Sequence, residues 1–312
     1  MAVNIIKHTS NIREPVWSPV ASKIVFRDYY ENLYTVDLDG STPKNLINDG
    51  GIAQWSPDGL FVYYLSLSGN QIGKINVNTL KSEIIYQAQD IHQFALSRSG
   101  TSLVISHKDR LVIAETDGSN VRIIVDSTSS WEFPDYENLS WSFDDTWVVT
   151  AANIERSYHV VAVNPYTRNK KIIYKKGYKP TCNPVNSLVA LINDLIEPKS
   201  ICLWDLTTEH LQIVELENHL MKSQSISGHF SWSTNGKLIA FVRQEKGGFI
   251  SNYKHKENAL CLLSVMDGKV TKIMKLHDGM GQETFSSPAW SPDNKMIVVT
   301  LSPDFALHVI TL

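Results

Sequence analysis

The amino-acid sequence predicts an all-β fold: a single domain, residues 1–312, folded as a seven-bladed β-propeller with four-stranded antiparallel blades. Three observations lead to this prediction. A short phrase recurs along the whole chain, an apolar run follows most copies at once, and turn residues separate short segments that show almost no helical periodicity. Repeats with a period near 40 residues are typical of propellers.

The repeated phrase is clearest in Gln54-Trp-Ser-Pro-Asp-Gly59. Looser copies are Trp17-Ser-Pro19, Trp141-Ser-Phe-Asp-Asp145, Trp232-Ser-Thr-Asn-Gly236 and Trp290-Ser-Pro-Asp-Asn294. The apolar runs that follow are KIVF, FVYYL, WVVTAA, LIAFV and MIVVTL. Proline presets φ for a tight turn, and Asp-Gly or Asp-Asn tolerates the positive φ that closes it. Each copy therefore predicts a strand, a tight turn and a second antiparallel strand.

Two degenerate copies complete a set of seven. They are Phe94-Ala-Leu-Ser-Arg-Ser-Gly100 and Pro180-Thr-Cys-Asn-Pro-Val-Asn186, in which Leu96 and Cys182 take the place of the tryptophan. In the second unit we expect strand A at 52–56, strand B at 60–65, strand C at 71–77 and strand D at 82–86. Four strands in each unit indicate propeller blades.

The two ends of the chain predict how the ring closes. The last unit supplies three strands, at 288–291, 296–301 and 306–311. We expect the fourth strand of that blade to come from residues 2–7, because this pairing would close the ring without leaving an open sheet edge.

Composition limits the class of protein. A net charge of −3 and 43% hydrophobic residues are ordinary for a globular protein and do not suggest a dedicated nucleic-acid binder. No run reaches the roughly 18 apolar residues of a membrane span. The start of the chain does not resemble a signal peptide, and the three cysteines favour buried thiols over a disulfide framework. We therefore expect a cytoplasmic protein without a membrane partner.

The phrase resembles the TolB-type (WD40-like) propeller repeat. Pro15-Val-Trp-Ser-Pro19 with Asp37-Leu-Asp-Gly40, and Pro288-Ala-Trp-Ser-Pro-Asp293, carry this resemblance. Leu203-Trp-Asp205 and Gly228-His229 give a weaker, local likeness to WD repeats, which would have the same architecture. The resemblance implies a propeller fold. It leaves function open, because similar repeats occur in binding proteins, in peptidase gating domains and in some lyases.

The lengths of the connections favour one face as the working surface. In such blades the A–B and C–D turns lie on one face, and the B–C and D–A connections lie on the other. The long segments all fall on the second, hereafter the long-loop face: 125–137, 216–228, 243–257 and 275–286. Their apolar residues predict a protein contact or, alternatively, caps on the blades. These residues are Trp131, Phe133, Tyr136, Met221, Phe249, Tyr253, Met280 and Phe285.

A second candidate site is the channel mouth, where the innermost strands begin. The polar residues expected there are Arg13, Glu14, His92, Glu137, Lys179 and His229. Propeller mouths are commonly polar and wet, so a purely structural role is the alternative to a site for a small ligand or a peptide end.

Catalytic motifs are weak in this sequence. The chain contains no G-x-S-x-G nucleophile elbow and no P-loop. His92, His229 and His277 could converge on a metal as in oligogalacturonate lyases, although isolated histidines are more often structural. The basic run from Arg168 to Lys179 is placed on an outermost strand, where lysines protect a sheet edge.

We therefore expect a non-catalytic propeller that binds another protein or a peptide, as an assembly scaffold or an inhibitor. We expect no cofactor, no bound metal and no nucleic-acid partner. The alternative is a metal-dependent lyase or hydrolase that acts at the channel mouth.

Overall fold

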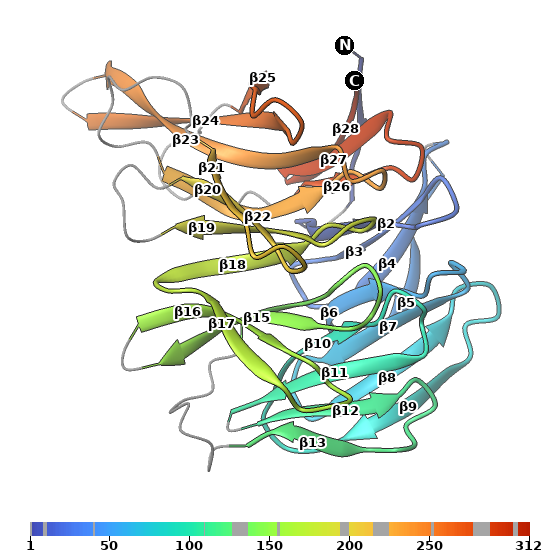
Figure 1. The fold of residues 1–312 in the computed structure, drawn as a ribbon. Helices are drawn as coiled ribbons and strands as arrows, with labels where there is room; N and C mark the ends of the chain where they lie inside the picture. Colours follow the sequence, from blue (N-terminus) through green and yellow to red (C-terminus); the bar gives the residue numbers. More distant parts are fainter. Residues whose placement is uncertain are drawn as a thin grey trace.

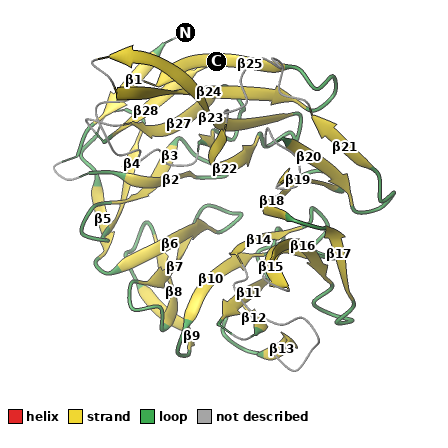
Figure 2. Ribbon diagram, turned by 90° about the vertical axis from the view of Figure 1, so that its left-hand side faces the viewer, coloured by secondary structure: helices red, strands yellow, loops and turns green. Residues whose placement is uncertain are grey.

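The structure is a computed structural model that forms a ring of seven β-sheets around a central axis (Figures 1 and 2). It describes residues 2–8, 11–39, 41–108, 110–126, 137–154, 157–193, 200–214, 225–250, 253–276, 288–301 and 305–312. Every sheet has four antiparallel strands, and the described residues contain no helix and so no helical membrane span. The predicted seven-bladed all-β propeller is confirmed.

The strands follow the chain from the innermost to the outermost position of each blade. Blade 1 has β2 (Arg13–Trp17), β3 (Lys23–Arg27), β4 (Leu33–Asp37) and β5 (Lys44–Ile47). Blade 2 has β6 (Gly50–Trp55), β7 (Phe61–Ser66), β8 (Gln71–Asn76) and β9 (Ser82–Gln87). Blade 3 has β10 (Ile91–Leu96), β11 (Ser102–His107), β12 (Leu111–Glu115) and β13 (Arg122–Val125). Blade 4 has β14 (Glu137–Trp141), β15 (Val148–Ile154), β16 (Ser157–Val163) and β17 (Lys170–Tyr174).

The remaining blades complete the ring. Blade 5 has β18 (Gly177–Cys182), β19 (Leu188–Asn193), β20 (Ile201–Asp205) and β21 (Leu211–Val214). Blade 6 has β22 (Ser225–Trp232), β23 (Leu238–Ile250), β24 (Tyr253–Ser264) and β25 (Val270–Leu276). Blade 7 has β26 (Ala289–Trp290), β27 (Met296–Leu301), β28 (Ala306–Thr311) and, from the other end of the chain, β1 (Val3–Ile6).

One predicted loop is a pair of strands. The sequence predicts a long connection at 243–257, but β23 and β24 pair from Leu238 with Ser264 to Ile250 with Tyr253, apart from a bulge after Lys246. These strands have 13 and 12 residues and reach well beyond the rest of the blade on the left of Figure 1. The prediction was wrong because it judged this segment by its length alone and did not test it for strand pairing.

The repeated phrase forms a self-contained turn. In blade 2, the Ser56 hydroxyl donates to the Asp58 carboxylate at 2.5 Å and accepts from the Phe61 backbone N–H at 2.9 Å. The same carboxylate accepts from the backbone N–H of Leu60. The bond from the Ser56 hydroxyl, and next the bond from the Leu60 N–H, hold the pKa of Asp58 below its usual value. The equivalent serine and aspartate of blades 4 and 7 are bonded in the same way.

In four blades the tryptophan of the phrase is hydrogen-bonded to the blade before it. Its ring packs between neighbouring sheets, and its indole N–H donates to a carbonyl of the preceding innermost strand. The four pairs are Trp55 to Val16 (3.0 Å), Trp141 to Ala95 (2.9 Å), Trp232 to Thr181 (3.0 Å) and Trp290 to Ser231 (2.9 Å). Every acceptor residue directly precedes the residue of its own blade that stands at the tryptophan position of the phrase. The repeat therefore supplies both the turn and the joint between blades.

The core is divided among the joints between blades rather than gathered in one centre. The B strands are almost entirely buried, because both faces of each sheet pack on neighbouring blades. Cys182, Cys202 and Cys261 are buried and form no disulfide, as predicted. Lys170 and Lys171 lie on β17, the outermost strand of blade 4, which confirms the placement of the start of the basic run.

The ring closes as predicted. β1 pairs antiparallel with β28, from Val3 with Ile310 to Ile6 with Leu307. The joint between blades 7 and 1 also receives a bond from the Ile12 N–H to the Phe305 carbonyl, at 3.0 Å. Within the described residues, however, the buried indole nitrogen of Trp17 has no hydrogen-bond partner. The closing joint therefore has the pairing of β1 with β28 in place of the tryptophan bond that four other joints have.

We expect deletion of residues 1–8 to destabilise the protein strongly, because it removes the β1 ladder and exposes β28. Ile6 is buried and Ile5 on the same strand is exposed, so they form a matched pair. In urea denaturation, Ile6→Ala should cost about 2–4 kcal/mol and Ile5→Ala less than about 0.5 kcal/mol. Equal effects of the two substitutions, or an unchanged melting temperature after the deletion, would contradict this account of closure.

The tryptophan joints make a second, comparative prediction. Trp141→Phe removes a bonded indole and leaves the Ala95 carbonyl without its donor, whereas Trp17→Phe removes a buried donor that has no partner. We expect Trp141→Phe to lower the free energy of unfolding by about 1–2 kcal/mol more than Trp17→Phe does. Chemical denaturation of the two variants measures the difference, and a larger loss for Trp17→Phe would show that the joints are not held in this way.

Candidate functional site

The structure describes only part of the predicted apolar surface. Phe249 and Tyr253 lie near the tip of the hairpin of β23 and β24, where Phe249 pairs with Lys254. The other predicted residues lie outside the described residues: Trp131, Phe133, Tyr136, Met221, Met280 and Phe285. The antiparallel order of the blades places the hairpin tip at the same end as the D–A connections, as expected for the long-loop face.

At the channel mouth, the innermost strands share a backbone irregularity. Six of them have a β-bulge near their first residues, for example between Arg13 and Val16 in β2 and between Tyr178 and Thr181 in β18. Within these bulges Glu14, Asn138 and Lys179 have positive φ values of 47°, 59° and 52°. Such a conformation costs a non-glycine residue on the order of 1–3 kcal/mol. Bulges re-aim side chains and are common beside functional sites.

The predicted mouth residues divide between several blades. Arg13 and Glu14 lie on β2, His92 is exposed on β10, and Lys179 lies on β18. The backbones of Glu137 and His229 lie on β14 and β22, and their side chains lie outside the described part of the structure.

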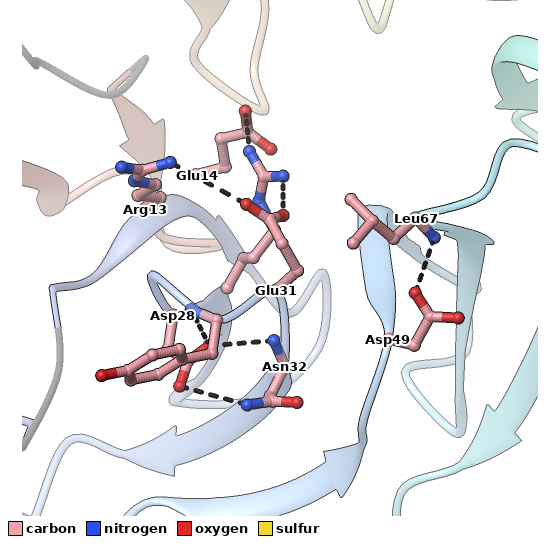
Figure 3. Close-up of polar contacts among 9 residues, drawn as sticks. Arg13, Glu14, Asp28, Glu31, Asn32, Asp49 and Leu67 are labelled. Atoms are coloured by element: carbon pink, nitrogen blue, oxygen red, sulfur yellow. Dashed lines mark hydrogen bonds and ion pairs between the residues drawn. The ribbon is translucent and has the colours of Figure 1, made fainter.

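Arg13 and Glu14 belong to a chain of charged contacts in blade 1 (Figure 3). Arg27, at the end of β3, donates one terminal nitrogen to Glu14 at 2.9 Å and the other to Glu31. Glu31 also lies 3.8 Å from the Arg13 guanidinium. Arg27 and Glu31 are largely covered, with 17% of each side chain exposed, whereas 53% of the Glu14 side chain is exposed. The accessible charge of this cluster is therefore mainly the Glu14 carboxylate and the edge of Arg13.

The turn that follows β3 presents two tyrosines to solvent. The buried carboxylate of Asp28 accepts from the backbone N–H groups of Tyr30 and Asn32, each at 2.9 Å, and from the Asn32 amide at 3.4 Å. This network fixes the turn. Tyr29 and Tyr30 nevertheless stay 55% and 71% exposed, and Arg13 lies over the Tyr29 ring at 5.0 Å. Two exposed aromatic side chains on a stiff turn are typical of a recognition surface.

The same surface continues onto blade 2. The Glu31 carbonyl accepts from the Gly50 N–H at 2.7 Å, and the Asp49 carboxylate accepts from the Leu67 N–H at 3.2 Å (Figure 3). Residues 49 and 50 thus connect the B–C turns of both blades. Leu67 is 59% exposed on the second turn. We call Tyr29, Tyr30 and Leu67, with Arg13 and Glu14, the blade 1–2 patch.

A half-open cavity of about 190 Å³ lies in the joint below this patch. Its apolar lining consists of Pro15, Val16, Leu33, Ile52 and Ala53, together with Gly51. Glu14 and Arg27 also line it. Gly51 has no room for a side chain, because a Cβ there would lie 3.0 Å from the Leu65 carbonyl oxygen. The cavity therefore combines an apolar interior with the charged cluster of blade 1.

The described residues contain no cluster of metal ligands, and Cys182 is not a reactive thiol. Among the described residues, no three His, Cys, Asp or Glu side chains gather closely enough to hold a metal ion. Burial raises the pKa of the Cys182 thiol to about 11, so this residue is almost entirely protonated near neutral pH.

Sequence reasoning missed Tyr29, Tyr30 and Leu67. The prediction assigned the site to long connections, whereas these residues lie on the B–C turns of blades 1 and 2, which are short. The available signal was local: Asp28-Tyr-Tyr-Glu-Asn32 places two adjacent aromatics between residues that favour turns, directly after a buried strand.

Comparison with known proteins shows similarity of fold at low sequence identity. A scan against protein-family models and a search of curated proteins give no match. An oligogalacturonate lyase from Vibrio parahaemolyticus has a TM-score of 0.75 and 15% identity, over 99% of this chain and 91% of that one. TolB from Acinetobacter baumannii scores 0.59 with 16% identity over 91% and 67%. A chain of a mitotic checkpoint complex scores 0.69 with 16% identity over 99% and 91%.

The turn at Asp28 supports a stability prediction. Asp28→Ala would leave two backbone N–H groups of a partly buried turn without their acceptor, and we expect it to cost about 1–3 kcal/mol. Asp49→Gly removes a single, exposed bond at a position whose φ of 64° glycine adopts freely, and should cost less than about 0.5 kcal/mol. Urea denaturation measures both, and amide hydrogen exchange at Tyr30 should quicken only in Asp28→Ala. Similar losses in the two variants would show that Asp28 does not fix the turn.

Proposed function

We propose that this propeller is a non-catalytic protein-binding module, a scaffold or an inhibitor, which holds its partner on the long-loop face. The blade 1–2 patch carries this proposal. Two tyrosines and a leucine are exposed on turns that the backbone bonds of Asp28 and Asp49 hold in place. Rigid aromatic side chains provide contact area at a low cost in conformational entropy, and hot spots of protein interfaces are rich in tyrosine and arginine.

The size of this cavity suits one side chain of a protein partner better than a whole small molecule. Pockets for small molecules usually measure about 300–1,000 Å³. At about 190 Å³, this cavity suits a single side chain of a partner. The paired hairpin of β23 and β24, which carries Phe249 and Tyr253, adds a second projecting element at the same end of the ring. We also propose a reducing, cytoplasmic environment, which suits three buried cysteines that form no disulfide.

The test is capture of a partner with matched aromatic variants. Tyr30→Ser and Phe249→Ser alter the long-loop face, and Tyr166→Ser alters an exposed tyrosine of similar character on the opposite, tight-turn face. We expect a captured partner to bind the first two variants at least tenfold more weakly in titration calorimetry and to bind Tyr166→Ser normally. A partner that is lost only with Tyr166→Ser, or that binds all three variants equally, would contradict the proposal.

A second candidate is a metal-dependent lyase or hydrolase at the channel mouth, favoured by the structural likeness to an oligogalacturonate lyase. In that case His92, His229 and His277 are the candidate ligands. Metal analysis of the purified protein separates the two functions, because stoichiometric Mn, Zn or Ca that is lost in His92→Ala and His229→Ala would favour the enzyme.

A further inference from the structure

The cavity between blades 1 and 2 shows which kind of partner side chain it can hold. Its interior suits an aliphatic stem, since Pro15, Val16, Ile52 and Ala53 provide carbon surface on the walls of neighbouring innermost strands. A long charged side chain commonly buries such a stem against apolar surface while its charged end stays near water.

The charged groups of the cavity favour a cation at that end. Both terminal nitrogens of Arg27 are already bonded to carboxylates, and its side chain is only 17% exposed. Glu14 is 53% exposed, and the bond from Arg27 engages one of its two oxygens. The acceptor that an incoming side chain meets is therefore the Glu14 carboxylate. The backbone of Glu14 has a positive φ of 47° inside the bulge of β2.

The surroundings add to this preference. Among the described residues in and next to the patch, four carboxylates accompany two guanidinium groups: Glu14, Asp28, Glu31 and Asp49 with Arg13 and Arg27. The exposed ring of Tyr30 lies on the turn beside this cluster, and the faces of tyrosine rings attract cations. Arg13 already makes such a contact with Tyr29.

From these observations we infer that the cavity is a socket for one lysine or arginine side chain of the protein partner, with the stem between Val16 and Ile52 and the charged end on Glu14. This inference rests on the proposed function, which it deepens by naming the chemistry of the partner. Partner residues next to the anchor would then pack on Tyr30 and Leu67.

The inference can be tested without knowing the partner. The probes are the Nα-acetyl N-methylamides of arginine, lysine, norleucine and glutamate, titrated into the full chain with a ¹³C-labelled Ile52 methyl group as reporter. Norleucine has the lysine stem without the charge. We expect arginine and lysine to shift the Ile52 signal, norleucine to bind at least tenfold more weakly, and glutamate to cause no shift.

Two variants and a control locate the binding. Glu14→Gln keeps the shape of the side chain and removes its charge, and should weaken the arginine probe at least fivefold. Ala53→Leu fills the cavity and should abolish the shift. Glu83→Gln, on the outermost strand of blade 2, removes an exposed carboxylate that pairs with Lys74, and should change nothing. Melting temperatures confirm that each variant is folded.

Three results would overturn the socket: norleucine that binds as well as lysine, glutamate that shifts Ile52 more than arginine does, or no shift with any probe. A captured partner that depends on Tyr30 but binds Glu14→Gln and Ala53→Leu normally would leave the proposed function in place and remove the socket. If the probes bind at Ile52 but no captured partner depends on the long-loop face, the socket would stand and the proposed function would be contradicted.

Discussion

The recurring constraint on the ring is a hydrogen bond between blades: at four of the seven joints, the indole of the phrase's tryptophan donates to the preceding innermost strand. It ties the position of one blade to the backbone of its neighbour, and it does so at the place where the tight turn begins. Because each bond joins adjacent blades only, the ring behaves as a linear array of units whose stability is the sum of units and interfaces. The strand β1 then joins the two ends of this array.

The fold could be predicted because its determinants are local and repeated. The Trp-Ser-Pro-Asp-Gly phrase contains the turn, the ring that packs between blades and the indole donor. Even the degenerate copies, with Leu96 or Cys182 in the tryptophan position, could be recognised from their spacing and from the strands that follow. The pairing that completes blade 7 could be inferred because the last unit has only three strands and the start of the chain supplies a fourth.

The candidate site was harder to predict, because it depends on contacts between separate blades. Arg13 and Glu14 lie on β2, but their partners Arg27 and Glu31 come from the next strand and turn, and no local pattern in the sequence pairs them. Tyr29, Tyr30 and Leu67 lie in short turns, where loop length carries no information. The bulges that redirect the mouth residues also depend on strand register, which the repeat does not reveal.

Val16 takes part in two features at once. Its carbonyl accepts the indole bond of Trp55, and the residue also lines the cavity between blades 1 and 2. A side chain seated in that cavity would therefore touch the same stretch of backbone that fastens these two blades together. By thermodynamic linkage, a partner side chain that binds in the cavity only when the ring is folded would raise the free energy of unfolding. Binding of a partner and the stability of the ring would thus be linked at the joint between blades 1 and 2.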